Sequence, residues 1–156
     1  MTASRKARGL VTIMMAITGA AFFFGFLTEE LGHVTPEQAQ SVPQELIIRY
    51  IVAMAIGGAL SGLVCAGLFG RHGVGGWVLG LLGAVLASLL AGLIGSAIGQ
   101  VPDMAAGGFN MTEVISIAFG LVLIPLAMAG RPVMIAVWAV LMVVTHLLAR
   151  RARGHD

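Results

Sequence analysis

Five long stretches of this chain contain no charged residue. They are Gly9–Thr28, Tyr50–Gly70, His72–Pro102, Val114–Gly130 and Pro132–Ala149. A helix needs roughly 20 mainly apolar residues to cross about 30 Å of hydrocarbon. Because a bilayer offers no water to unpaired backbone groups, such runs must be helical. The sequence therefore predicts an all-α fold, a polytopic transmembrane helix bundle.

The composition argues against a separate water-soluble domain. Hydrophobic residues make up 58% of the 156 residues and charged residues only 10%, whereas a soluble domain carries about a quarter charged residues. The longest polar connection, Thr28–Glu45, is short. We therefore expect a single integral membrane domain over residues 1–156, with the lipid bilayer as its surroundings and no nucleic-acid partner.

Charged and glycine-rich breaks between the apolar runs predict five spanning helices. We expect them at about residues 10–27, 44–70, 74–99, 112–129 and 132–149. The first is expected to stay uncleaved, because Glu29 and Glu30 follow it where a signal peptide would have small residues. A short surface helix is expected to start at Thr35, with Pro36 in its first position. Between the last two helices, Pro132 disfavours helical geometry at the preceding residue.

The Lys and Arg residues predict a cytoplasmic N-terminus. That side would then receive Arg5, Lys6, Arg8, Arg71 and Arg131. Five complete crossings would put a basic tail outside, against the positive-inside rule; this tail contains Arg150, Arg151 and Arg153. In the alternative, four crossings are followed by a re-entrant or strongly bent hairpin over Val114–Ala149, which returns the tail inside. We favour five crossings, because both halves of this segment are apolar enough to insert.

Small residues recur every four positions on the third predicted helix. One row is Gly76, Gly80, Ala84, Ser88, Gly92 and Ser96, and the adjacent row is Gly83, Ala87, Ala91, Gly95 and Gly99. The second helix has a shorter row, Gly58, Gly62, Ala66 and Gly70. In lipid, helices associate where small side chains let their backbones approach closely. We predict that these two helices pack tightly, and that the third also contacts a further helix of this chain, of a copy or of another protein.

Few ionisable groups lie near the apolar runs, and they form one possible polar site: Arg49, Glu29, Glu30, Glu113 and Arg131. We expect Arg49 to pair with Glu45 one helical turn away. A functional interpretation has Arg49 hold an anionic solute or a lipid headgroup, against Glu29, Glu30 or Glu113. Arg131 is an inner-loop charge in the five-crossing topology and a deeper residue in the alternative. The lack of a carboxylate at mid-depth argues against a proton- or sodium-coupled carrier.

No pattern in the chain indicates a cofactor, a metal ion or catalysis. Of the four histidines only His146 lies inside an apolar run, so a haem held by facing histidines is not expected. No cysteine and histidine cluster has zinc spacing, and the single cysteine, Cys65, is expected to be a packing residue. We therefore expect a protein that is not an enzyme and carries no cofactor.

The leading hypothesis is a non-enzymatic accessory or assembly subunit of a bacterial inner membrane. It would pack through its small-residue face as a homo-oligomer or in a larger membrane complex. One alternative is a small channel or transporter for an uncharged or anionic solute, using Arg49 and the seam between the second and third helices. A weaker alternative is a holin-like pore former, a class that is also small, glycine-rich and basic at its tail.

Overall fold

The computed structural model describes residues 4–35, 37, 41–108 and 110–154, and these form an all-α protein. The long helices are α1 (Arg5–Gly32), α3 (Gln44–Cys65), α4 (Gly73–Gly107), α5 (Met111–Met128) and α6 (Pro132–Arg153), and α3 continues into the short 3-10 turn η1 (Ala66–Leu68). All five are long and apolar enough to cross a membrane. The predicted helical bundle is thus confirmed, and the protein is a multi-pass membrane protein by length and composition.

Most helices extend beyond the predicted bounds. The side chain of Ser4 accepts a hydrogen bond from the Ala7 amide at 3.2 Å and caps α1 before its basic residues. At the other end, α1 continues through Glu29 and Glu30 to Gly32. The prediction that the third helix ends near residue 99 is wrong, since α4 continues through Pro102 to Gly107. A proline within a membrane helix is tolerated where other groups satisfy the freed backbone. The predicted surface helix lies largely on residues 36 and 38–40, outside the described residues.

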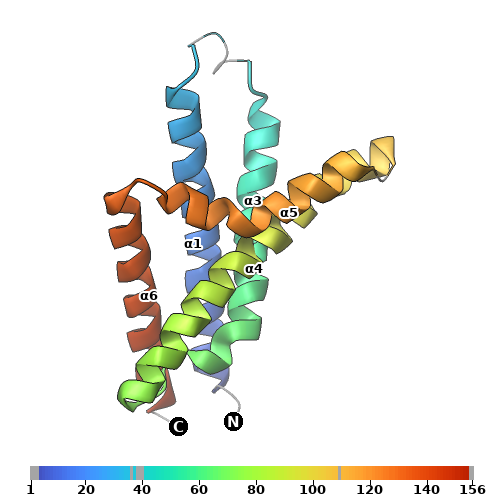
Figure 1. Cartoon of the computed structure of the whole chain (residues 1–156). Helices are drawn as coiled ribbons and strands as arrows, with labels where there is room; N and C mark the ends of the chain where they lie inside the picture. Colours follow the sequence, from blue (N-terminus) through green and yellow to red (C-terminus); the bar gives the residue numbers. More distant parts are fainter. Residues whose placement is uncertain (1–3, 36, 38–40, 109, 155–156) are drawn as a thin grey trace.

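Both ends of the described chain lie at the same end of the bundle (Figure 1). The helices α1 and α3 run antiparallel, α4 leaves the bundle at a steep tilt, α5 returns across it and α6 runs back beside α1. The hydroxyl of Ser4 donates to the carbonyl of Ala152 at 3.5 Å, and the guanidinium of Arg153 donates to the Ala66 carbonyl at 3.1 Å. This arrangement has the geometry of the bent-hairpin alternative, because α5 lies across the bundle instead of along it.

The close packing predicted for the second and third helices is present between α3 and α4. The buried residues of α4 are the members of the two small-residue rows. A Cβ atom added at Gly57 of α3 would come within 2.5 Å of the Ala91 carbonyl oxygen and the Gly95 amide. The short row of small residues on α3 faces α1 instead of α4. Cβ atoms added at Gly58 and Gly62 would meet the α1 backbone.

The other row on α4, which runs from Gly76 to Ser96, is covered by helices of the same chain. Gly92 lies against Gly120 of α5, and Gly80 lies against the ring of His146 of α6. Between them, the Ser88 hydroxyl accepts a hydrogen bond from Trp138 of α6. The further helix contacts predicted for this face are therefore made within the chain, by α5 and α6.

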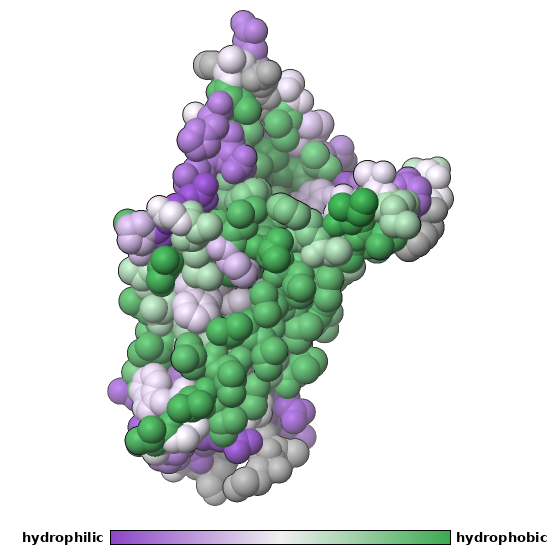
Figure 2. All heavy atoms as spheres, viewed as in Figure 1, coloured by the Kyte–Doolittle hydropathy of each residue, from purple (hydrophilic) through white to green (hydrophobic). Residues whose placement is uncertain are grey.

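Apolar side chains cover the outside of the bundle between two polar ends, as Figure 2 shows for one face. Ile48, Val64 and Val133 are among the large apolar side chains that are mostly exposed. In water this surface would be costly, since each Å² of exposed apolar surface costs about 25 cal/mol. In a bilayer the same surface contacts acyl chains, so the exposed apolar belt supports lipid contact.

Positive charge is concentrated at the end that holds both termini. Seven of the nine Lys and Arg residues belong to segments that meet there: Arg5, Lys6, Arg8, Arg71, Arg150, Arg151 and Arg153. The other two each pair with a carboxylate: Arg49 with Asp103 at 2.6 Å and Arg131 with Glu29 at 2.8 Å. The prediction that Arg131 belongs with the basic residues of the N-terminal side is therefore wrong, because the crosswise course of α5 brings it to the acidic end of α1.

Candidate functional site

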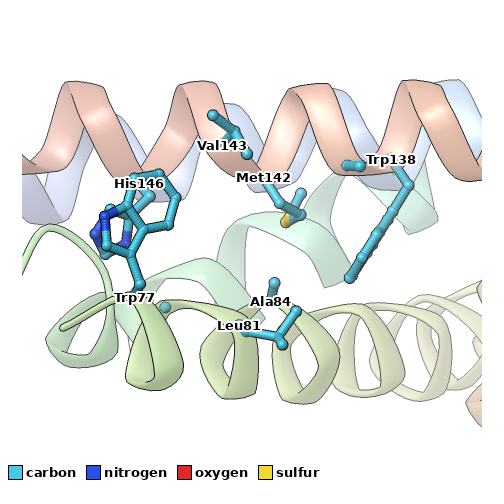
Figure 3. A pocket seen from close by; sticks show the side chains of 9 residues that line it. Trp77, Leu81, Ala84, Trp138, Met142, Val143 and His146 are labelled. Atoms are coloured by element: carbon cyan, nitrogen blue, oxygen red, sulfur yellow. The ribbon is translucent and has the colours of Figure 1, made fainter. Parts of the chain in front are cut away.

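A pocket of about 120 Å³ lies between α4 and α6 (Figure 3). Its nine lining residues are Trp77, Gly80, Leu81 and Ala84 of α4 and Trp138, Ala139, Met142, Val143 and His146 of α6. They follow helical spacing on both helices, so each helix contributes one face. The two helices meet at the basic end and diverge away from it (Figure 1). The pocket forms where this divergence coincides with the small residues Gly80 and Ala84.

His146 is the polar side chain in the pocket wall that is most deeply buried, with 2% of its surface exposed. Its Nδ1 accepts a hydrogen bond from the Gly70 amide at 3.3 Å. Its ring stacks on the indole of Trp77, with centroids 4.5 Å apart and planes inclined by 24°. Gly80 makes room for the ring, since a Cβ atom at that position would overlap it. Contacts with three residues, Gly70, Trp77 and Gly80, therefore fix the orientation of this imidazole.

The second nitrogen of His146 has no hydrogen-bond partner among the described residues. Because Nδ1 accepts the Gly70 amide, a neutral ring carries its proton on Nε2, which is then a buried donor without an acceptor. Leaving such a group unpaired costs about 1–3 kcal/mol.

Trp138 closes the other end of the pocket. Its indole Nε1 donates a hydrogen bond to the Ser88 hydroxyl at 3.0 Å, which joins α6 to α4 within the apolar region. Leu81, Met142 and Val143 provide apolar walls between the two indoles. None of the nine lining residues is a carboxylic acid, a cysteine or a hydroxyl residue. The pocket is thus suited to hold an apolar group, with one aromatic ring at each end and a single imidazole.

The predicted polar site is divided among three places in the structure. Arg49 forms a two-point contact with Asp103, through hydrogen bonds of 3.2 and 2.6 Å, where pairing with Glu45 was expected. Glu29 pairs with Arg131 at the junction of α5 and α6. Glu113 caps α5, accepting the Asn110 amide at 2.7 Å. Of the five predicted residues, Glu29 and Arg131 are therefore brought into contact, whereas Arg49 and Glu113 each contact a residue outside the predicted set. Glu30 follows Glu29 near the end of α1.

Two features of these sites were not predicted from the sequence: the position of Asp103 and the role of the two tryptophans. Asp103 lies beyond the predicted end of the third helix near residue 99, yet the structure places it on α4, paired with Arg49. Trp77 and Trp138 were not singled out, although they are the two tryptophans of the chain and both line the pocket. A local signal for the tryptophans was present in the sequence. An aromatic residue with a polar tip inside an apolar run needs a hydrogen-bond partner when it is buried.

No group of three or more His, Cys, Asp or Glu side chains in the described part of the chain could hold a metal ion. Cys65 is buried, as a packing residue would be. Comparison of the chain with protein-family models, with curated proteins and with solved structures finds no match. The interpretation of the pocket therefore depends on its own geometry.

Proposed function

We propose that this protein is a non-enzymatic accessory subunit of a bacterial inner membrane, which assembles with copies of itself or with a larger membrane complex. The observation that supports this most directly concerns α5. Its buried residues, Gly120, Leu123, Ile124 and Ala127, all lie in its second half. The first half, together with the end of α4, forms an arm (residues 104–108 and 110–119) that projects from the side of the bundle (Figure 1).

The arm has the side chains that a partner helix in a membrane requires. Met111 and Ile115 are 71% and 62% exposed, and small residues stand exposed beside them at Ala105, Ala106 and Ala118. Exposed apolar residues alone carry little weight in lipid, because acyl chains satisfy them equally well. Small residues allow close helix contact, and on the arm these contacts are not made within the chain. We therefore assign assembly to the arm, since the small-residue face of α4 is already covered.

The charge distribution supports an orientation with both termini in the cytoplasm. Positively charged residues near membrane helices are retained on the cytoplasmic side, and seven of them meet at the end that holds both termini. The opposite end has Glu29 and Glu30 on α1 and Glu45 on α3. This orientation also places the basic tail inside, which five complete crossings would not.

A transporter that uses Arg49 and the seam between α3 and α4 has less support. Backbone contacts at Gly57 and Gly95 close that seam, and Asp103 occupies both nitrogens with which Arg49 would hold an anion. A pore through this seam would require the separation of two helices that pack at glycine-to-backbone distance.

Native purification followed by mass spectrometry tests the proposal. We expect a second copy or a stoichiometric membrane partner to remain bound in mild detergent. The Ala118→Leu variant, with a bulky side chain on the arm, should lose this species, whereas Ala136→Leu, at an exposed position on α6, should keep it. A wild-type protein that purifies as a bare monomer would contradict the proposal. Solute flux in liposomes by the chain alone would favour transport, and rapid lysis on modest expression would favour a pore former.

A further inference from the structure

A second pocket lies next to the first, closer to the basic end of the seam between α4 and α6. This basic groove has a volume of about 380 Å³ and is lined by His72, Leu147, Arg150, Arg151 and Gly154. On α6, Val143 of the pocket is followed by Leu147 and Arg150 of the groove at spacings of four and three residues, which places them along one side of the helix. The groove and the pocket therefore succeed each other along the seam between α4 and α6.

The chemistry of this seam changes in a definite order from the end of the bundle inward. The basic groove has two arginines and a histidine, and none of the described residues that line it is a carboxylic acid. Next comes the ring of Trp77, which stacks on His146; tryptophan is a side chain that is enriched at the level of lipid headgroups. Apolar walls follow at Leu81 and Val143, and both of these side chains are substantially exposed on the outside of the bundle.

We propose that this seam binds one anionic phospholipid, with its phosphate in the basic groove and one acyl chain in the pocket between Trp77 and Trp138. The order of cations, interfacial rings and apolar walls matches the order of phosphate, glycerol and acyl chain in such a lipid. Basic pockets between membrane helices on the cytoplasmic side are a known mode of headgroup recognition. A soluble anion would use the groove and leave the apolar pocket unexplained. The proposal does not depend on the arm.

The expected preference follows from the two arginines. Each basic residue near the membrane surface favours an anionic lipid by about fivefold. A zwitterionic lipid offers the same acyl chains without net charge, so it should enter the pocket but not be enriched there. We expect the preference for phosphatidylglycerol over phosphatidylcholine to be about fivefold if one arginine contacts the phosphate and about 25-fold if both do.

The tryptophans provide a direct readout. Both tryptophans of the chain line the pocket, so bromine atoms on an acyl chain bound there quench the fluorescence of the protein. The full-length protein is reconstituted into phosphatidylcholine vesicles that contain a small fraction of brominated phosphatidylglycerol. Parallel vesicles contain the same fraction of brominated phosphatidylcholine. We expect clearly stronger quenching by the brominated anionic lipid, and equal quenching by the two lipids would overturn the proposal.

Two matched pairs of variants locate the site. The Arg150→Gln/Arg151→Gln variant should lose the excess quenching, whereas Arg5→Gln/Lys6→Gln, which removes the same charge from the same end on α1, should keep it. Loss of the excess in both variants would show a general surface attraction and would refute a specific site.

The second pair tests the acyl chain without any change of charge. Ala139 lines the pocket at an exposed position of α6, so Ala139→Leu should fill the pocket and reduce the excess without disturbing the core. Ala136→Leu is the control, exposed on the same helix outside the pocket. Unchanged quenching in Ala139→Leu would overturn the proposal. So would displacement of the excess by inorganic phosphate at constant ionic strength, because the groove would then be a site for a free anion.

Discussion

Replacing Gly92 by alanine tests whether the fold depends on close approach of the α4 and α5 backbones. A Cβ atom at this position would overlap the carbonyl oxygen of Gly120 and come within 3.0 Å of its carbonyl carbon. Neither atom can rotate away, since both belong to the backbone of α5. Ordinary contact begins near 3.4 Å, so α5 must move outward along its whole contact with α4.

The cost can be worked from this geometry. Forcing one extra carbon into a packed helix interface costs about 1–3 kcal/mol. Alanine is a better helix former than glycine by up to about 1 kcal/mol, which offsets part of that cost. We therefore expect Gly92→Ala to lower the free energy of unfolding by about 1–2 kcal/mol, a large fraction of the stability of a domain of this size.

The matched control is Gly75→Ala on the same helix. No atom outside the local backbone lies within 4 Å of a Cβ added there, so this variant receives the gain in helix propensity alone. Unfolding of both purified proteins is followed by titration with sodium dodecyl sulfate in dodecyl maltoside micelles, with tryptophan fluorescence as the signal. Gly92→Ala should unfold at a lower fraction of sodium dodecyl sulfate than the wild type, and Gly75→Ala at the same or a higher fraction.

A second substitution tests the same contact from α5. Gly120→Ala should also be destabilising, because its Cβ would meet the Gly92 carbonyl oxygen at 2.5 Å. The double variant should lose less stability than the sum of the single losses, since the first substitution already separates the helices. If Gly92→Ala proved as stable as Gly75→Ala, the backbone contact between α4 and α5 would not exist as described.

Three further predictions concern side-chain contacts between helices. Arg49→Gln and Asp103→Asn should each lower the free energy of unfolding by about 0.5–1 kcal/mol, because the pair is partly exposed, whereas Glu45→Gln should have no measurable effect in the same titration. The charge-swapped variant Arg49→Asp/Asp103→Arg should regain most of the loss, and a further loss would refute the pairing. Trp138→Phe should cost about as much as Ser88→Ala, roughly 1 kcal/mol, and the two effects should not add; fully additive losses would show that these side chains act separately.

The helices and their contact faces were accessible to prediction because both depend on local sequence. The absence of charge over about 20 residues forces helical structure in lipid, whatever the rest of the chain does. The four-residue spacing of Gly76, Gly80 and Ala84 places them on one side of α4, and all three are buried. Their neighbours could not be named in advance, since a row of small residues indicates close contact without identifying the partner.

The ion pairs and the course of α5 were not accessible in the same way. Arg49 and Asp103 are separated by 54 positions in the sequence, and they meet because α4 continues past Pro102 with one side turned toward the start of α3. Hydropathy shows that α5 is apolar but does not give its direction. Its course across the bundle brings Gly120 against Gly92, a contact that the sequence alone does not show.

The pocket illustrates the same limit. The sequence shows that His146 is a histidine within an apolar run. It does not show that Gly70 and Trp77 hold the ring in place. The space beside the ring arises from the angle between α4 and α6, and no residue spacing encodes that angle directly.

The placement of both termini on one side of the membrane is the central claim, and cysteine accessibility tests it most directly. Cys65 is the single cysteine and is buried, so a Cys65→Ala background allows new cysteines at Ser4, Gly154 and Val34. A membrane-impermeant maleimide is applied to intact cells and then to permeabilised cells. We predict that Val34→Cys is labelled in intact cells, and that Ser4→Cys and Gly154→Cys are labelled only after permeabilisation. Labelling of Ser4→Cys and Gly154→Cys from opposite sides would contradict the account.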